Sequence, residues 1–251
     1  MKTLIPLFLS IILPSCGPLN QLMKAKPCKP AGSFVDFSAT PKKQTKRSPW
    51  HYAAYATDPA VLRNANHHRK LYVAPVRVSD LRPISKKLAA TEYSSARKEH
   101  AAEIAGVLRQ DFTKQLSQRE GALYRHAAAP GADAMILELN LTELDPTSAK
   151  GNITKTVVKY TVGPLPSMGV GLFTGGCIAI EGRLREGKTG KVVFQFADKE
   201  KDKATIYNAR DYMALGHAKR TSREWAEQLD AFLRTPKGEV KDSFFLTPMP
   251  Y

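Results

Sequence analysis

The sequence has few cysteines, no long apolar run and no internal repeat, and these features limit the classes of protein to which it can belong. Only 3 of its 251 residues are cysteine, but the chain is long enough to bury a core without disulfide staples. Its apolar stretch at residues 4–13 is too short to cross a hydrocarbon core about 30 Å thick, which needs about 20 residues. A content of 43% hydrophobic and 24% charged residues excludes wholesale disorder and a polytopic membrane protein.

The spacings that mark common catalytic and metal sites are also missing. Six histidines are present, yet none forms a His-x-x-x-His pair, and no Cys-x-x-Cys occurs. Residues 166–169 lack the glycine that precedes the serine of a nucleophile elbow. The glycine-rich residues 163–176 contain no lysine and lead into an expected strand, whereas a phosphate-binding loop leads into a helix. The sequence therefore predicts no catalytic residue, no metal and no cofactor.

The N-terminal residues predict where the protein is located. Lys2 and the apolar residues 4–13 have the character of a signal peptide. Residues 13–16, Leu-Pro-Ser-Cys, resemble the bacterial lipobox, in which the cysteine is acylated before cleavage. The resemblance implies a signal peptide at residues 1–15 and lipidation of Cys16, where several acyl chains give durable anchoring. Gly17, in place of an aspartate, favours the outer membrane, with the protein facing the periplasm. A plain secreted protein and an uncleaved anchor are the alternatives.

Acidic residues are scarce relative to basic ones. The formal net charge is +15, from 38 Lys and Arg against 23 Asp and Glu. Residues 17–70 hold ten of the basic residues and two of the acidic ones, a net +8, and their prolines favour an extended spacer. Cations beside a lipid anchor gain about 1 kcal/mol each from anionic headgroups, and a merely soluble linker is the alternative. Because the charge lies beside the expected anchor and no aromatic stacking motif accompanies it, no nucleic-acid partner is predicted.

The order of segments predicts one folded domain behind this tether. We expect a lipidated, basic, proline-rich tether at residues 16–66, an α+β domain at 67–235 and a C-terminal tail at 236–251. The tether contains aromatic-rich segments at residues 32–38 and 50–55. A solvated linker has no need of them, so we expect these segments to pack on the domain.

The domain follows the order strand, helix, sheet, helix. Residues 134–145 alternate in polarity, which is typical of a half-buried strand. Further strands are expected at 71–78, 153–162, 177–186 and 191–197, the last two joined by a hairpin. An apolar stripe predicts a helix at 94–116, and a capping box of Thr221 and Glu224 predicts the start of another. Pro75 indicates an edge strand or a bulge. The predicted fold class is α+β, a single domain with a mixed or antiparallel sheet of about five strands and two main helices packed on one face.

Several short motifs occur in one order along the chain. The lipobox and the aromatic segments are followed by Tyr-Val-x-Pro-Val at residues 72–76, Ala-Ile-Glu-Gly-Arg-Leu-Arg at 179–185, Thr-Gly at 189–190 and Trp-Ala-x-x-Leu at 225–229. This order resembles an uncharacterised bacterial lipoprotein family, a domain-of-unknown-function group of the thirty-three-thirteen type, over residues 33–234. The resemblance implies the fold and an envelope location and brings no known reaction. One departure is Lys188, which stands where an acidic residue is expected before Thr189.

Two features of the sequence have open interpretations. Among the glycines of residues 163–176 lie four apolar side chains, Met168, Val170, Leu172 and Phe173. They either cover one end of the core or form a recognition loop for a protein partner or a lipid. Lipidation of Cys16 leaves Cys28 and Cys177, either as two unpaired thiols or as a disulfide, which the envelope permits.

These observations predict a lipid-anchored cell-envelope protein that acts as a non-enzymatic binding or scaffold module. Its expected partners are the membrane and an envelope protein, while the partner's identity and the oligomeric state stay open. One alternative, a cell-wall or lipid hydrolase, requires convergence in one cleft of two or more of Glu138, Ser167, Glu181 and His217. The other, a carrier of a small apolar ligand, requires an enclosed pocket between the sheet and the first helix.

Overall fold

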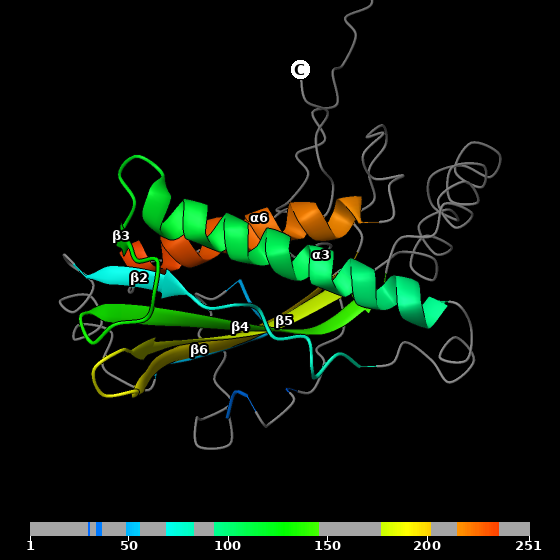
Figure 1. Cartoon of the computed structure of the whole chain (residues 1–251), viewed down its shortest axis with the longest axis horizontal. Helices are drawn as coiled ribbons and strands as arrows, with labels where there is room; N and C mark the ends of the chain where they lie inside the picture. The colour runs from blue at the N-terminus through cyan, green and yellow to red at the C-terminus, as the bar shows by residue number, and fades with distance from the viewer. Residues whose placement is uncertain are drawn as a thin grey trace, which may run out of the picture.

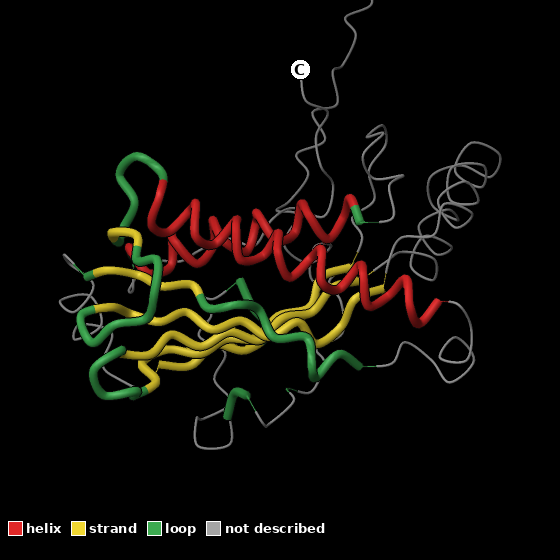
Figure 2. Tube along the Cα trace, in the orientation of Figure 1, coloured by secondary structure: helices red, strands yellow, loops and turns green. Residues whose placement is uncertain are grey.

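The chain folds into two layers, a sheet and a pair of helices that cover one of its faces (Figures 1 and 2). This computed structural model describes residue 30 and residues 34–36, 49–55, 69–82, 93–145, 177–201 and 215–235. The two helices lie on the same side of the sheet and extend roughly along its strands, so the core lies between the layers.

Six strands and two long helices are found in the described residues. In chain order the elements are β1 (Tyr52–Tyr55), β2 (Lys70–Val73), α3 (Tyr93–Thr113), a π-helical turn η1 (Lys114–Gln118), β3 (Arg125–His126), β4 (Ala134–Asp145), β5 (Cys177–Glu186), β6 (Val192–Lys201) and α6 (Gly216–Arg234). The sheet order is β1-β6-β5-β4-β2-β3. β2 is parallel to both of its neighbours, and the other pairs are antiparallel. The α+β class is confirmed, with a mixed sheet of six strands where about five were expected.

Alternating side chains fix the orientation of β4, as the sequence predicts. Its side chains toward the helices are fully buried and belong to the core, namely Met135, Leu137, Leu139 and Leu141. A bulge between Leu141 and Glu143 shifts the alternation, which brings Leu144 into the same core. The opposite face of the strand carries polar residues, among them Glu138 and Asn140.

The apolar stripe of α3 is also confirmed. Its buried members are Ala101, Ile104, Leu108 and Phe112, and Leu116 continues the stripe in η1. This spacing of three and four residues places the side chains on one face of the helix. α3 packs against α6, β4 and β2, so the stripe faces the interior.

Residues 49–55 form part of the folded domain. Trp50 is buried in the core, with its ring centroid 4.9 Å from that of Phe196 and 5.2 Å from that of Phe232. The residues that follow form β1, antiparallel to β6. The prediction that this aromatic segment packs on the domain is therefore confirmed.

A buried carboxylate joins this segment to β6 and α6. Asp198 is 2% exposed and accepts hydrogen bonds from the backbone N–H of His51 at 3.0 Å and from the indole N–H of Trp225 at 2.8 Å. The Nδ1 atom of His51 lies 2.6 Å from the same carboxylate. A buried carboxylate needs such donors to offset its lost hydration, so this cluster ties three elements together.

The other aromatic segment lies on the sheet face away from the helices, where residues 34–36 form a short blue stretch in Figure 1. The side chain of Phe34 is buried, and the guanidinium carbons of Arg183 and Arg77 lie 4.5 Å and 5.4 Å from its ring centroid. Arg183 also donates a hydrogen bond to the carbonyl oxygen of Phe34 at 3.0 Å. Cation–π contacts and this hydrogen bond dock Phe34 on the sheet.

The capping box at Thr221 was a wrong prediction. α6 begins at Gly216, so Thr221 lies inside the helix, where it is fully buried. Its hydroxyl oxygen is 3.4 Å from Nδ1 of His217, one turn earlier. Burial of His217 and Ala218 against the rest of the domain extends the helix toward its N-terminus, because packing outweighs local capping signals.

Pro75 interrupts the first predicted strand of the domain, because it has no N–H to donate. β2 ends at Val73, and pairing along β4 resumes at Arg77, whose N–H donates to the carbonyl oxygen of Leu139 at 2.9 Å. The two-residue β3 lies outside β2 in the sheet. The hairpin between β5 and β6 is confirmed, while the strand expected at 153–162 lies outside the described residues.

Candidate functional site

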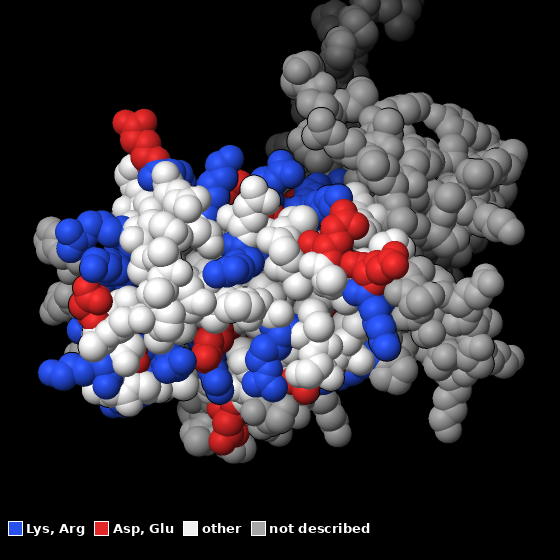
Figure 3. Space-filling view, viewed as in Figure 1, with Lys and Arg blue, Asp and Glu red and all other residues white. Residues whose placement is uncertain are grey.

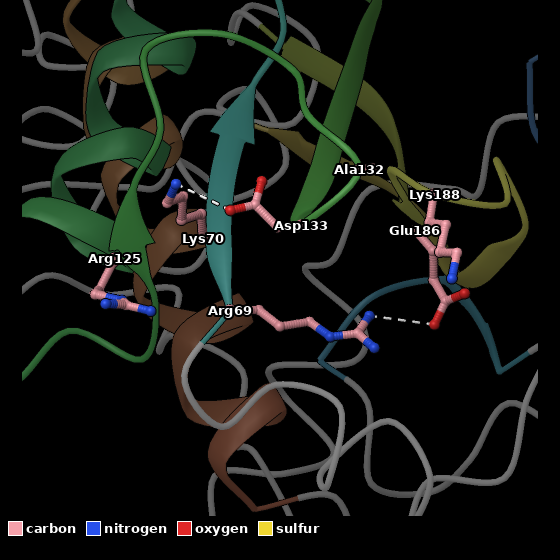
Figure 4. A pocket seen from close by; sticks show the side chains of 7 residues that line it. All are labelled: Arg69, Lys70, Arg125, Ala132, Asp133, Glu186 and Lys188. Carbon is pink, nitrogen blue, oxygen red and sulfur yellow. Dashed lines mark hydrogen bonds and ion pairs between the residues drawn. The ribbon is translucent and has the colours of Figure 1, made fainter.

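A pocket of about 330 Å³ opens at the end of the sheet where β2 and β4 begin. It is lined by residues from four separate segments, shown in Figure 4: Arg69, Lys70, Arg125, Ala132, Asp133, Glu186 and Lys188. β2 and β3 supply one side of the pocket, and the loop before β4 and the β5–β6 hairpin supply the other. The fold therefore assembles residues that are far apart in the sequence.

A close backbone contact holds the hairpin against the loop before β4. The N–H of Gly187 donates to the carbonyl oxygen of Ala134 at 2.8 Å. A Cβ atom at Gly187 would overlap the carbonyl oxygens of Gly131 and Ala134, so only glycine fits there without movement of the backbone. This contact fixes the position of Glu186 and Lys188 relative to Asp133.

One ion pair crosses the pocket between Arg69 and Glu186. Nη1 of Arg69 lies 3.2 Å from Oε1 of Glu186, and the hydroxyl of Thr189 donates to the other carboxylate oxygen at 3.0 Å. The Thr189 hydroxyl, and after it the Arg69 guanidinium, hold the pKa of Glu186 below its ordinary value, although burial acts in the opposite direction. Glu186 therefore stays ionised and positions Arg69 at the pocket.

A second ion pair joins Lys70 and Asp133, with Nζ 2.9 Å from Oδ2. The hydrogen bond and charge of Lys70 lower the pKa of Asp133. Both side chains are largely exposed, so the pair contributes little to folding. In the register of β2 and β3, Lys70 lies beside Arg125, and this places two cations on adjacent strands.

The pocket carries more positive than negative charge. Its lining has two arginines and two lysines against two carboxylates, a net charge of +2. In the space-filling view, blue side chains gather at the end of the molecule over the start of β2 and the β5–β6 hairpin (Figure 3). The described residues that line the pocket include no serine, cysteine or histidine. The arrangement suits the binding of an anionic group.

The acidic candidates for a hydrolase are engaged in structural contacts elsewhere. Glu138 lies 2.6 Å from Nε of Arg183 and 3.1 Å from Nη2 of Arg185. Burial alone would raise the pKa of Glu138, but its hydrogen bonds with the two guanidinium groups outweigh burial and lower that pKa. Glu181 is buried, and the side-chain amide of Asn140 donates to it at 3.3 Å.

These acidic candidates do not meet the histidine. Glu138 on β4 and Glu181 on β5 have different partners on the sheet face that carries Phe34, whereas His217 is buried in α6. Ser167 lies outside the described residues. In the space between sheet and helices, where a carrier would need its pocket, the rings of Trp50, Phe194, Phe196 and Phe232 pack together.

Cys177 is a free thiol at the start of β5. Burial raises its pKa to about 11, so the thiol stays protonated near neutral pH and is a poor nucleophile. No group of three or more His, Cys, Asp or Glu side chains in the described part of the chain is arranged to hold a metal ion. Cys28 lies outside that part.

The other predicted site residues also fall outside the described residues. They are the lipidation site Cys16 and the four apolar residues of the glycine-rich loop, Met168, Val170, Leu172 and Phe173. Sequence reasoning missed the charged pocket because its residues come from four distant segments. The one available signal was Lys188, the departure from the family pattern in the hairpin. None of the helices within the described ranges is both long enough and apolar enough to span a membrane.

Comparisons with known proteins identify a family and several distant structures. A family model described as "Protein of unknown function (DUF3313)" matches residues 42–229. No curated protein matches the chain.

Three solved structures are similar to the chain at low identity. The PelC dodecamer from Paraburkholderia phytofirmans is 12% identical, over 71% of this chain and 98% of that chain, with a TM-score of 0.37. Protein XCC0632 from Xanthomonas campestris, matched by the family model DUF330, is 11% identical, over 68% and 88%, with a TM-score of 0.36. A structure described as a "putative lipoprotein from Caulobacter crescentus CB15" is 12% identical, over 70% and 96%, with a TM-score of 0.33.

Proposed function

The chain belongs to the DUF3313 family, whose function is unknown, and from its own residues we propose that it is a lipid-anchored cell-envelope protein. Its folded domain acts as a non-enzymatic binding or scaffold module that faces the periplasm, with the charged pocket as its binding site. Two properties of the chain support this proposal: its N-terminal sequence and the distribution of its charge.

The N-terminal sequence supports the anchor. Residues 13–16 have the pattern of a lipobox, and Gly17 follows the cysteine. The net charge of +8 in residues 17–70 lies next to that cysteine, where it would be attracted to anionic headgroups. An anchor at Cys16 and a basic tether act on the same membrane surface and reinforce each other.

The observation that carries the binding function is the surplus of positive charge in the pocket. Elsewhere on the sheet, cations share a partly buried carboxylate, as Arg183 and Arg185 share Glu138. At the pocket, four cations meet two carboxylates, and exposed ion pairs of this kind add little to folding stability. A surplus that folding does not require supports a role in binding an anionic partner.

Labelled palmitate tests the anchor in cells that express the full chain. We expect label in the wild-type protein and in the membrane fraction, and none in Cys16→Ala. The matched control is Cys28→Ala, which should keep its label. Absence of label from the wild-type protein would refute lipidation.

Crosslinking in intact cells tests the binding function of the pocket. We expect a specific crosslinked species with the wild-type chain, and a weaker one with Lys188→Glu. Lys98→Glu is the matched control, because Lys98 is exposed and lies in α3, whose N-terminal end is at the opposite end of the sheet from the hairpin (Figure 1). An equal loss with both variants would show that the pocket has no special role.

The glycine-rich loop is a second proposed contact with an envelope protein. Its apolar residues, including Phe173, stand among glycines, and binding residues are found disproportionately in connecting segments. We expect Phe173→Asp to abolish the crosslink to a protein partner while the thermal midpoint stays unchanged. An unchanged crosslink would remove the loop from the binding surface.

A further inference from the structure

We propose that the charged pocket binds a phosphate group, with a phosphomonoester preferred. This inference rests on the proposed binding function of the same pocket and adds the chemical class of the ligand. The phosphate can belong to a lipid headgroup or to a soluble phosphate ester, since the group that the pocket would contact is the same in both.

The donors around the pocket suit an anion with several oxygens. Arg69 offers a planar guanidinium that can donate two parallel hydrogen bonds, whereas Lys70 and Lys188 are compact point charges on flexible stems. Arg125, beside Lys70 across the β2–β3 register, adds a second guanidinium. The cavity is therefore lined by two guanidinium groups and two ammonium groups, which match the several acceptor oxygens of a phosphate group.

The charge balance distinguishes a phosphate from a carboxylate ligand. The pocket already holds the carboxylates of Asp133 and Glu186, and a net charge of +2 is left. A phosphomonoester carries a charge of about −1.5 to −2 at neutral pH, which compensates this surplus. A ligand with a single carboxylate would compensate only part of the +2 charge, and its carboxylate would repeat the groups that Asp133 and Glu186 already supply.

The existing ion pairs hold the cations in place without blocking them. Thr189 anchors Glu186 from the hairpin, and Glu186 in turn positions Arg69. The Lys70–Asp133 pair is exposed, so its ammonium can turn toward an incoming anion at little cost. Figure 4 shows Lys70 at the start of β2 and Arg69 just before it, each reaching toward its carboxylate.

Backbone contacts hold the β5–β6 hairpin and the loop before β4 together as one side of the pocket. Gly187 packs against the carbonyl oxygens of Gly131 and Ala134, so the hairpin that carries Lys188 cannot move freely away from the loop that carries Asp133. A preorganised site loses less conformational entropy on binding than a mobile one. The pocket is therefore more than a cluster of independent surface cations.

Calorimetric titration of the full lipidated chain in a neutral detergent tests the proposal at constant ionic strength. The probes are inorganic phosphate, glycerol 3-phosphate, dihexanoyl phosphatidic acid and, as a competitor, a hexapeptide of Asp and Glu. We expect saturable one-site binding of the phosphate probes. Lys188→Glu, which brings the net charge of the pocket to zero, should weaken this binding about tenfold or more. Lys98→Glu, with the same change in total charge, should leave it unchanged.

The probes separate the two sources of the phosphate. Tighter binding of dihexanoyl phosphatidic acid than of glycerol 3-phosphate would identify a lipid headgroup, and similar binding of both would identify a soluble ester. The proposal is overturned by absence of saturable binding, by equal weakening in Lys98→Glu, or by tighter binding of the acidic peptide.

Failure of this proposal and failure of the proposed function give different results. If no phosphate probe binds but Lys188→Glu still weakens the crosslink in cells, the ligand class is wrong and the binding module stands. If phosphate binds but no palmitate is incorporated, the pocket stands and the anchor is wrong.

Discussion

Replacing Asp198 by alanine removes the acceptor at the centre of a buried cluster that joins residues 49–55 to the two layers. The carboxylate accepts from the backbone of His51 and the indole of Trp225, and it contacts the imidazole of His51. Each hydrogen bond to a charged group contributes about 1.5–3 kcal/mol. Their effects overlap, and removal of one partner from a buried charged cluster costs about 3–5 kcal/mol.

This loss is large compared with the stability of a typical domain, about 5–15 kcal/mol. Urea unfolding followed by tryptophan fluorescence measures it, since Trp50 and Trp225 both lie in the core. For a slope of about 2 kcal/mol per molar urea, we expect the midpoint of Asp198→Ala to fall by about 2 M. Asp198→Asn, which keeps one acceptor oxygen, should fall by less.

Glu227→Ala is the matched control, because Glu227 is exposed on the same helix as Trp225. Its midpoint should change by less than about 0.5 kcal/mol in equivalent free energy. If Asp198→Ala costs under about 1 kcal/mol, the cluster does not hold residues 49–55 against the domain, and the reasoning from buried hydrogen bonds fails.

Three further variants test the packing and the electrostatics. Gly187→Ala should lower the unfolding free energy by about 1–3 kcal/mol, because the added Cβ overlaps backbone atoms. The control Gly106→Ala has open space around its Cβ and should raise the unfolding free energy by about 0.5–1 kcal/mol. If Gly187→Ala is as stable as the wild type, the close contact at Gly187 is contradicted. The folded-state pKa of Glu138 is lowered, so its stabilisation is fully present above its ordinary pKa of 4.5 and is lost as the pH falls through the lowered value. The difference in unfolding free energy between wild type and Glu138→Gln should accordingly shrink below that pH, and a difference that stays constant in acid would contradict the pairing with arginine. The pKa of Cys177 in the folded chain is raised to about 11. At pH 7.5 its thiol should therefore react with a thiol reagent about a hundredfold more slowly in the folded chain than in the urea-unfolded chain, as measured by mass spectrometry of the peptide that contains it. Equal rates in the two states would refute burial of the thiol.

The elements predicted well from the sequence are those in which the pattern of apolar and polar side chains matches their burial in the fold. β4 alternates as far as Leu141, where the bulge follows, because one face meets the core and the other carries polar side chains. The stripe from Ala101 to Leu116 repeats at helical spacing for the same reason. In both cases a local pattern carries the information about burial.

The start of α6 and the pocket could not be predicted from local patterns. Thr221 and Glu224 have the spacing of a capping box, but burial of His217 extends the helix past them, and burial is decided by distant segments. The pocket depends on the parallel pairing of β2 with β4 and on a hairpin far along the chain. Arg69 and Glu186 meet only because the sheet pairs β2 and β5 with β4, so no local spacing in the sequence predicts their contact.

If Cys16 carries the lipid proposed above, the docking of Phe34 on the sheet limits how far the domain can move from that lipid. Phe34 comes 18 positions after Cys16, and a fully extended chain of that length reaches no more than about 65 Å. A tether that ended at residue 66 would reach nearly three times as far. With the anchor proposed above, the aromatic contact would shorten the chain between the lipid and the domain. The domain would then stay close to the bilayer, which would raise its effective concentration toward binding partners on that surface.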